Sequence, residues 1–430
     1  MVKSRRRLLA GSLALSSAFG LGVTATPAIA VSAPLTRVVS ANPVDTTPHV
    51  LDGTVLAIAE IGSTVVVGGA FTEVRNSTDT ATIKRSNLMA YNASTGHVLT
   101  GFAPALDGTV ETVVAAPESG AVIVGGSFRN VNGKAQRGLV KLSLADGSRI
   151  TSFSAPTNNT VNKVLLRGNR LLVGGEFTVI GGVARQRLAS VNAATGTVAT
   201  GFDLPVAGSR KPDIQPNAFV WEMDATTDGR YLVIVGNFLT VGGVSRNQVA
   251  IVDLQSNSLT PWQSPRTSYA CGSHVSFFFT DVEIAPTNDW FAMSARGGYA
   301  SPASTGLCDT VTRWELSPTS TSAQPTWVNY TGGDTLWSVT VTPAAVYVGG
   351  HQRWLNNPYC SNCAGPNAVS REGVGAVSPT DGSALAWNPG RARGVGAQEL
   401  VGTPRGLYIG SDTTRLAKEY HGRLGMFPAT

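Results

Sequence analysis

Short apolar runs, several of them ending in Gly-Gly-x-Phe, recur along most of the chain. They lie at Val65–Phe71, Val122–Phe128, Leu171–Phe177, Leu232–Phe238, Val346–Gly350 and Leu407–Gly410. Such runs, rich in β-branched residues and bounded by glycine, are typical of buried β-strands. Long helical periodicity is absent, and 48 glycines with 23 prolines would interrupt helices often. The pattern therefore predicts an all-β protein built from one repeated unit.

The spacing of the repeated glycines counts the units. The second glycine of each run, or its equivalent, falls at 69, 126, 175, 236, 350 and 410, so the gaps are 57, 49, 61, 114 and 60 residues. Because 114 is twice 57, a degenerate copy is expected near position 293, where the apolar segment Trp290–Ser294 lies. That makes seven units, and about 400 residues divided by 57 also gives about seven.

Each unit contains four strand-like segments joined by turns. In the second unit they are Thr109–Ala115, Ala121–Phe128, Leu139–Leu144 and Arg149–Phe153, with Asp146-Gly147 as the turn before the last. Four short strands in a repeat of about 40 to 60 residues are typical of a propeller blade. The sequence thus predicts a seven-bladed β-propeller with four antiparallel strands per blade. A parallel β-helix, the alternative, has shorter repeats.

The two ends of the repeat array complement each other. The last unit ends at Phe427, three residues before the C-terminus, and therefore lacks a fourth strand. A spare strand-like segment, Thr36–Val39, precedes the first unit. Pairing of the two segments would close the ring and hide both edges, so we expect closure by the N-terminal strand of the mature protein.

The N-terminus resembles an export signal. Lys3 and Arg5–Arg7 are followed by an apolar run, Leu8–Val23, and then by the small residues Ala28-Ile29-Ala30. The segment Ser4–Leu9 is similar to a twin-arginine signal, and a general secretory signal is the alternative. Interspersed glycines and serines make the run a poor membrane anchor. We expect residues 1–30 to be cleaved and residues 31–430 to be secreted as a single propeller without a transmembrane anchor.

Charge excludes one class of partner. The formal net charge of the chain is +6, and residues 1–30 carry four positive charges and no acidic residue, which leaves 6 − 4 = +2 for the mature part. A nucleic-acid-binding protein needs a basic surface that survives this subtraction. We therefore expect no nucleic-acid partner, and we expect a monomer that needs no cofactor and no metal.

Four cysteines, Cys271, Cys308, Cys360 and Cys363, lie in the second half of the chain. An even number in an exported protein indicates disulfides. Each of the pairs Cys271–Cys308 and Cys360–Cys363 belongs to one loop cluster, so these are the bridges we predict. The second pair could alternatively be half of a zinc site, but no second pair at metal-ligand spacing accompanies it.

Long loops indicate where a ligand could bind. The segments 206–217, 261–276, 296–310 and 351–373 are long for this repeat, and function concentrates in long loops on a rigid scaffold. The densest set of functional groups is in one of these loops: His351, Arg353, Trp354, Asn356, Asn357 and Tyr359. Such side chains suit carbohydrate or peptide recognition. Alternatively, Trp354 covers the core and the polar groups hold the loop in place.

The first strands of the units add polar groups on the same face. Aligning the units puts Glu111, Asn162, Trp221, Thr280, Trp337 and Gln398 in one column and Lys163, Glu222, Asp281, Ser338 and Glu399 in the next. We expect Trp221, Glu222, Asp281 and Trp337 to form the floor of the ligand site. Glu222 and Asp281 could act as an acid/base pair. Hydrogen bonding between blades, or a wet central channel, explains them equally well.

An arginine precedes the third strand of every unit. The seven are Arg85, Arg137, Arg187, Arg246, Arg313, Arg371 and Arg423. A ligand site would break such symmetry, so we interpret the arginines as structural forks that bind backbone carbonyls. An electropositive ring for an anionic ligand is the less favoured alternative.

The motifs resemble a known family of repeats. Val-Gly-Gly-x-Phe, the following Val241–Gly243, and Asn-Ala-x-Thr-Gly with a later Gly-Phe look like the delta-sixty-type propeller repeat of secreted bacterial proteins. They are also similar to the extracellular propeller of fungal cortical polarity markers. Gly349–Pro358, Arg371–Gly373 and Trp387–Arg391 resemble one bacterial subgroup more closely. The resemblance covers roughly residues 36–430 and implies the fold, but it carries over no catalytic residue.

Three functions fit the sequence. The first is an extracellular binding protein that recognises a cell-surface or environmental glycan or protein through the top face of the propeller. The second is a glycan-active lyase or hydrolase that uses Glu222, Asp281 or His351. The third is a structural adhesion or matrix protein. We favour the first, because fold alone never assigns an activity.

Overall fold

The computed structural model describes residues 35–269, 271, 277–298 and 306–430, all of which belong to the compact unit 33–430. The expected export signal therefore lies outside the described residues. The described part is all-β, as predicted, and its one helical element is the short 3-10 turn Pro265–Ser268. No helix in the described ranges is long and apolar enough to cross a membrane.

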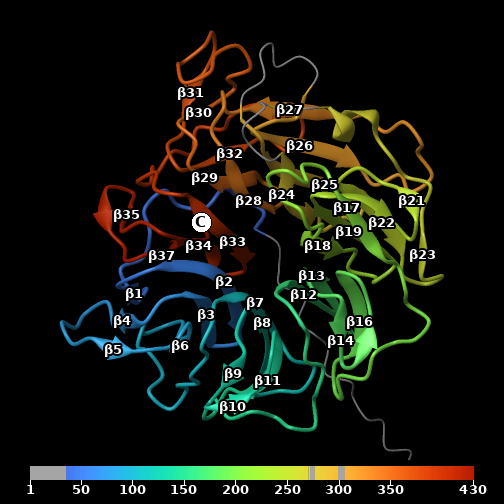
Figure 1. Ribbon diagram of the computed structural model, residues 1–430. Coiled ribbons are helices and arrows are strands. Elements are labelled where there is room, and N and C mark those ends of the chain that lie inside the picture. Colours follow the sequence, from blue (N-terminus) through green and yellow to red (C-terminus); the bar gives the residue numbers. More distant parts are fainter. Residues whose placement is uncertain (1–34, 270, 272–276, 299–305) are drawn as a thin grey trace, which may run out of the picture. The chain divides into compact units, whose positions relative to one another are not determined.

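Seven antiparallel sheets in the described residues share one strand order, in which the first strand of each unit pairs with the second and the second with the third (Figure 1). They are β2 (Thr54–Ile61), β3 (Thr64–Ala70) and β6 (Leu88–Asn92); β7 (Val110–Ala115), β8 (Ala121–Gly126) and β11 (Leu139–Ser143); β12 (Val161–Arg167), β13 (Arg170–Gly175) and β16 (Leu188–Asn192); β18 (Val220–Ala225), β19 (Tyr231–Gly236) and β22 (Val249–Asp253); β24 (Phe278–Ile284), β25 (Trp290–Arg296) and β26 (Thr310–Glu315); β28 (Leu336–Val341), β29 (Val346–Gly350) and β32 (Val374–Val377); β33 (Ala397–Thr403), β34 (Gly406–Ser411) and β37 (Leu424–Pro428). The degenerate copy expected near position 293 is strand β25.

The expected fourth strand is short or missing in most sheets. Within the described residues only β23 (Ser258–Leu259) and β27 (Trp327–Tyr330) extend their sheets to four strands. Four other sheets have a single bridge there: Tyr91–Val98, Leu142–Arg149, Val191–Val198 and Val377–Ala384. In these sheets a buried aromatic residue follows and a proline comes soon after, as in Phe102 and Pro104. The aromatic side chain turns into the core, and the proline that follows cannot donate a backbone hydrogen bond to the neighbouring strand. Pairing of the fourth strand therefore stops early.

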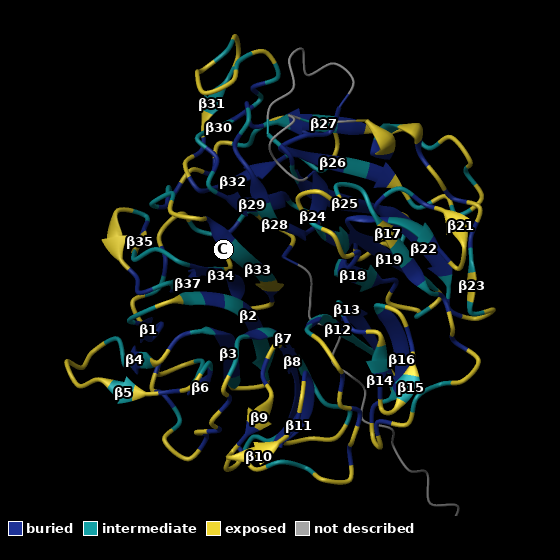
Figure 2. Ribbon diagram, in the orientation of Figure 1, coloured by how far each residue is buried: buried dark blue, intermediate teal, exposed yellow. Residues whose placement is uncertain are grey.

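The segments between the second and third strands form small hairpins at the rim. They are β4 (Glu73–Arg75) with β5 (Ile83–Lys84), β9 (Asn130–Val131) with β10 (Lys134–Ala135), β14 (Val179–Ile180) with β15 (Val183–Ala184), β20 (Phe238–Val241) with β21 (Val244–Ser245), β30 (Trp354–Leu355) with β31 (Val369–Ser370), and β35 (Arg415–Leu416) with β36 (Glu419–Tyr420). In addition, β1 (His49–Val50) pairs with β4 and β17 (Val206–Ser209) with β20. Figure 2 shows exposed hairpins around a buried interior.

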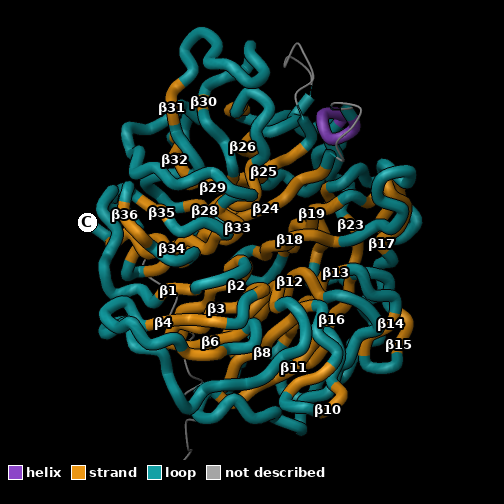
Figure 3. Tube along the Cα trace, turned by 60° about the vertical axis from the view of Figure 1, so that its left-hand side comes forward, coloured by secondary structure: helices purple, strands orange, loops and turns teal. Residues whose placement is uncertain are grey.

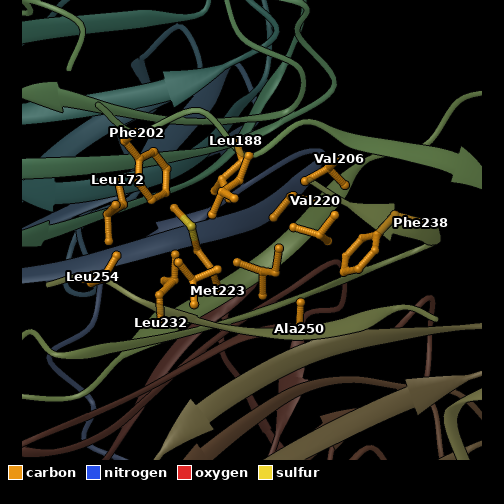
Figure 4. Packing of buried hydrophobic residues seen from close by; sticks show 14 of the residues in the cluster. Leu172, Leu188, Phe202, Val206, Val220, Met223, Leu232, Phe238, Ala250 and Leu254 are labelled. Atoms are coloured by element: carbon orange, nitrogen blue, oxygen red, sulfur yellow. The ribbon is translucent and has the colours of Figure 1, made fainter. Parts of the chain in front are cut away.

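The core lies between neighbouring sheets. In the cluster of Figure 4, Met223 of β18 packs with Leu172 of β13 and Leu232 of β19, so residues of two sheets share one apolar layer. The Gly-Gly pair of the repeat permits this packing. A Cβ on Gly174 would lie 2.8 Å from Val220 of the next sheet, and one on Gly175 would lie 2.3 Å from the carbonyl oxygen of Thr160. Neither position has room for a side chain.

The first strands contact one another in a cyclic order. Contacts run from β2 to β7, β12, β18, β24, β28 and β33, and β33 contacts β2 again. Gly410 of the last sheet approaches Val55 of the first in the same way as Gly174 approaches Val220, because a Cβ there would lie 2.7 Å from Val55.

The segment before the first sheet runs beside the last strand, β37. The amides of Ser40 and Val44 donate to the carbonyls of Pro428 and Met426 at 3.0 and 2.9 Å. Thr36–Val39, expected to be the pairing strand, is irregular, and the two backbone bonds come from residues just after it.

Candidate functional site

A β-bulge interrupts the first strand of every one of the seven sheets. The register shifts at Leu56, Glu111, Asn162, Trp221, Thr280, Trp337 and Gln398. A bulge leaves one residue unpaired and re-aims its side chain. All seven residues line one cavity of about 50 Å³ between the first strands, together with Glu222, Asp281 and Glu399. The column expected from the sequence is therefore a structural ring, which Leu56 completes.

Several polar groups around this cavity join neighbouring first strands. Asn162 Nδ2 donates to the carbonyl of Val220 at 2.9 Å, and Thr280 Oγ1 donates to that of Leu336 at 2.7 Å. The carboxylate of Asp281 accepts from the amide of Val339 at 2.7 Å. These bonds satisfy buried groups and hold the sheets in place. Hydrogen bonding between sheets, one of the interpretations open at the sequence level, is thus present.

The ammonium group of Lys163 interacts with several carboxyl groups next to the bulges. Lys163 Nζ lies 2.6 Å from Glu222 Oε1, and their side chains are 25% and 14% exposed. Burial raises the pKa of Asp281 to about 6 and that of Glu399 to about 7, although Lys163 opposes both shifts. Burial also raises the pKa of Glu222 against the pull of Lys163. For Lys163, burial lowers the pKa, but the three carboxylates outweigh it, so its pKa is raised and the ammonium stays charged.

Aromatic rings cluster at the bulge positions. Trp221 and Phe278 have ring centroids 5.5 Å apart. The guanidinium of Arg296 lies 5.3 Å from the ring of Phe278 and 5.1 Å from that of Trp337, so it stacks between them. Both tryptophans are half-buried, so each keeps an accessible part. We call Trp221, Phe278, Arg296 and Trp337 the aromatic mouth.

His351 is the one residue of the loop His351–Tyr359 that lies beside the aromatic mouth. Its Nδ1 is 3.3 Å from the carbonyl of Val395, which also accepts from Trp337 Nε1 at 2.8 Å. Burial lowers the pKa of His351, and Asp334 opposes the shift. The imidazole of His351 is therefore neutral at neutral pH, and in this form it can donate one hydrogen bond to a ligand and accept another.

The other polar side chains of this loop have structural partners. Arg353 forms a fork with the buried carboxylate of Asp334, with Nε 2.8 Å from Oδ2, and stacks on Trp354 at 4.4 Å. Asn356 Oδ1 accepts from Asn329 Nδ2 at 2.5 Å. Asn357 is fully buried and binds backbone groups only. These contacts fit the alternative that the polar groups hold the loop in place.

The loop His351–Tyr359, which we call the rim loop, lies apart from the central cavity except at His351. Figures 1 and 3 both show the β30–β31 hairpin well away from β28 and β33, which line the cavity. Tyr359 is 72% exposed and lines a different hollow, of about 260 Å³. The candidate residues thus fall into two sets. Trp221, Glu222, Asp281 and Trp337 share the cavity, with His351 near its mouth, and Arg353, Trp354, Asn356, Asn357 and Tyr359 belong to the rim.

Both predicted disulfides are present. Cys271 bonds to Cys308 and Cys360 to Cys363, with Cα–Cα distances of 5.7 and 5.4 Å. Cys360 and Cys363 therefore offer no thiolates to a zinc ion. Among the residues that the structure describes, no cluster of three or more His, Cys, Asp or Glu is arranged to hold a metal.

The predicted arginine forks are present, but the arginines that form them differ from the expected set. Arg85, Arg185, Arg246 and Arg371 each donate through Nη1 to the preceding carbonyl and through Nη2 to a carbonyl 14 residues later, at 2.5 to 3.3 Å. Arg187 and Arg423 lie two positions further on, have positive φ, and bind different carbonyls. Arg313 lies within β26, and Arg137 is exposed. The expected column therefore combined positions that are not equivalent in the strand register.

Several residues that build the aromatic mouth and its support were not predicted from the sequence. Phe278 and Arg296 lie at the beginning of β24 and the end of β25, and they face each other because the register pairs them. Asp334, which binds both Arg353 and Arg393, lies just before β28. Their positions within the strand register, compared between units, were the signal that could have identified them.

Comparisons with known proteins agree with this architecture. The family model of a domain of unknown function described as a β-propeller, DUF5122, matches residues 119–153. The β-propeller domain of Cps50 (Swd1) from Myceliophteria thermophila superimposes with a TM-score of 0.51 at 9% identity, covering 87% of this chain and 96% of that one. This chain contains a β-propeller domain. The computationally designed protein Ika8 gives a TM-score of 0.48 at 10% identity, over 92% of this chain and 99% of that one. No curated protein matches the sequence of this propeller significantly.

Proposed function

We propose that the chain is an exported binding protein. In this proposal residues 1–30 are a cleaved twin-arginine-type signal. Residues 31–430 form one seven-bladed propeller, which recognises an extracellular glycan or protein and acts as a monomer. The ligand lies over the aromatic mouth.

The seven sheets and the cyclic contacts of their first strands support a closed ring of seven blades. Closure joins the last sheet to the first through the close approach of Gly410 to Val55. The backbone bonds from Ser40 and Val44 to β37 supply the outer edge that the last sheet lacks, so the N-terminal segment closes the ring. A paired edge cannot recruit a second chain.

Export is supported by the order of charged, apolar and small residues in positions 1–30 and by the two disulfides. Structural disulfides persist in oxidising compartments and are rare in the cytosol.

The observation that carries the binding proposal is the aromatic mouth itself. Two tryptophans from different sheets, an arginine stacked between rings, and the neutral imidazole of His351 surround one opening. Aromatic faces stack on sugars or apolar side chains, and the surrounding donors and acceptors fix orientation. The cavity below, at about 50 Å³, is small and has room for a few water molecules, so we place the ligand on the mouth.

Hydrolysis or lyase chemistry by Glu222 and Asp281 is the second candidate, because both carboxyls line the cavity and burial raises both pKa values. Against it, Glu222 is paired with Lys163, and Asp281 accepts two backbone amides at 2.7 Å. Groups so engaged support the fold.

A glycan array probed with the purified, processed protein tests the proposal. We expect retention of one glycan class without release of product. Product release would favour the enzyme, and absence of any binding to glycans or to surface-protein extracts would favour a structural adhesion or matrix role.

A further inference from the structure

The disulfide Cys360–Cys363 is placed differently from its counterpart. It joins residues only three positions apart, with Cys363 exposed and Cys360 half-buried. Cys271 and Cys308 are 37 positions apart, and Cys308 is buried. In the chain-entropy model the stabilisation by a disulfide grows with the length of the loop that it closes, so the short loop gains least. Stability therefore gives little reason for this bridge.

The backbone around Cys360 and Cys363 is held in shape without the sulfur–sulfur bond. Asn357 is fully buried, and its Nδ2 donates to the carbonyls of Cys360 and Cys363 at 3.3 and 2.8 Å. Its Oδ1 accepts from the amide of Gly365 at 3.0 Å. Between the cysteines, Asn362 Oδ1 accepts from Arg353 Nη2 at 2.6 Å. Opening the disulfide would leave all of these bonds in place.

A hollow of about 260 Å³ lies along the same loop. Its lining comes from both sides of the cysteine pair, with Pro358 and Tyr359 before it and Pro366 and Asn367 after it. Tyr359 is 72% exposed, which leaves its ring free to contact another chain. The hollow opens to solvent and has room for one or two side chains of an extended peptide.

We propose that Cys360–Cys363 is a thiol–disulfide exchange site whose co-reactant is a protein dithiol. Exposed disulfides are the labile, regulatory or catalytic ones. This role is independent of ligand binding at the aromatic mouth.

The exchange proceeds in two steps. A thiolate of the partner attacks Sγ of Cys363, the more exposed residue of the pair, and forms a mixed disulfide. The bond to Cys360 breaks, and Cys360 leaves as a thiolate that takes a proton from water. The partner's second thiolate then attacks the partner sulfur of the mixed disulfide, and Cys363 leaves as a thiolate. The partner dithiol loses two electrons, and the cysteine pair gains them.

The test uses the oxidised, purified protein and a reduced, unfolded model protein with two cysteines. After quenching and alkylation, peptide mass spectrometry should find Cys360 and Cys363 modified at least tenfold faster than Cys271 and Cys308. Near-UV circular dichroism should not change, and one model dithiol should be oxidised per pair reduced. Equal rates at all four cysteines, or reduction only after unfolding, would overturn the proposal.

A monothiol locates the attack. When reduced glutathione reacts with the oxidised protein and the mixture is quenched, peptide mass spectrometry should find the mixed disulfide on Cys363 at least ten times as often as on Cys360. Equal or reversed amounts would contradict attack at Cys363.

Discussion

At the scale of single residues, recurring side chains act on the backbone more than on a ligand. Four buried arginines each bridge two carbonyls that are 15 residues apart, and Arg185 alone donates to the carbonyls of Ala184, Ala199, Thr200 and Phe202. A lysine could not reproduce this fork, because it presents one flexible charge in place of a planar set of donors.

Arg185→Ala and Arg185→Lys should therefore destabilise the protein. We expect the free energy of unfolding of the alanine variant to fall by about 1 to 3 kcal/mol, because several carbonyls would lose their donor. Arg137→Ala is the matched control, because Arg137 is exposed, and it should change stability by less than about 0.5 kcal/mol. Chemical denaturation measures both, and equal stability of the three variants would refute the fork.

The carboxyls of the central cavity predict a pH dependence of stability. Burial raises the pKa of Glu399 to about 7 and of Asp281 to about 6, so the folded state binds more protons than the unfolded state between about pH 4 and 7. Their contribution to stability is therefore present at low pH and is lost as pH rises through these values. His49 opposes this below pH 6.5, because burial lowers its pKa to about 4.

Between pH 8 and 7, above the ordinary pKa of histidine, the carboxyl effect is least opposed by His49 and by His351, whose pKa burial also lowers, and the melting temperature should rise as pH falls. Glu399→Gln should weaken this slope, while Glu372→Gln, at an exposed position, should leave it unchanged. Thermal unfolding at a series of pH values measures the slope. A melting temperature that falls over this window in the unmodified protein would contradict the assignment.

At the scale of elements, the repeat predicts the positions of the strands better than it predicts their lengths. The second strand of each unit, including the degenerate β25, was predictable because buried strands need uninterrupted apolar runs. The length of the fourth strand was overestimated. In the sequence, the aromatic residue and the proline that end this strand early look like the residues at the end of a longer strand. The bulge column was predictable as a column, but the bulge was not, since no single residue type marks it.

The two parts of the candidate site differ in the same way. The rim loop was singled out by its composition, and Arg353 and Asn356 find their partners in Asp334 and Asn329, which precede the loop. The aromatic mouth was found only in part, because Phe278 and Arg296 meet through the register of β24 and β25, which a single sequence does not display.

At the scale of the whole molecule, the closure that we propose would join the two ends of the chain. Deleting residues 32–43 removes the Ser40 bond to Pro428 and the main-chain partner of Trp387 Nε1 at Ser40, and it exposes the edge of β37. The melting temperature should fall by several degrees, or the protein should aggregate. Calorimetry and light scattering measure these outcomes, and a shortened protein that melts like its parent would rule out this closure.

Binding of a ligand over the aromatic mouth can be measured directly. Once the array identifies a ligand, calorimetric titration of Trp221→Ala, Trp337→Ala and Trp354→Ala compares the mouth with the rim. Loss of an aromatic anchor typically costs on the order of 2 kcal/mol, so the first two variants should bind at least tenfold more weakly while keeping their circular dichroism. Trp354→Ala should bind normally. Normal binding by both mouth variants, with weakened binding by Trp354→Ala, would contradict the account and move the site to the rim loop.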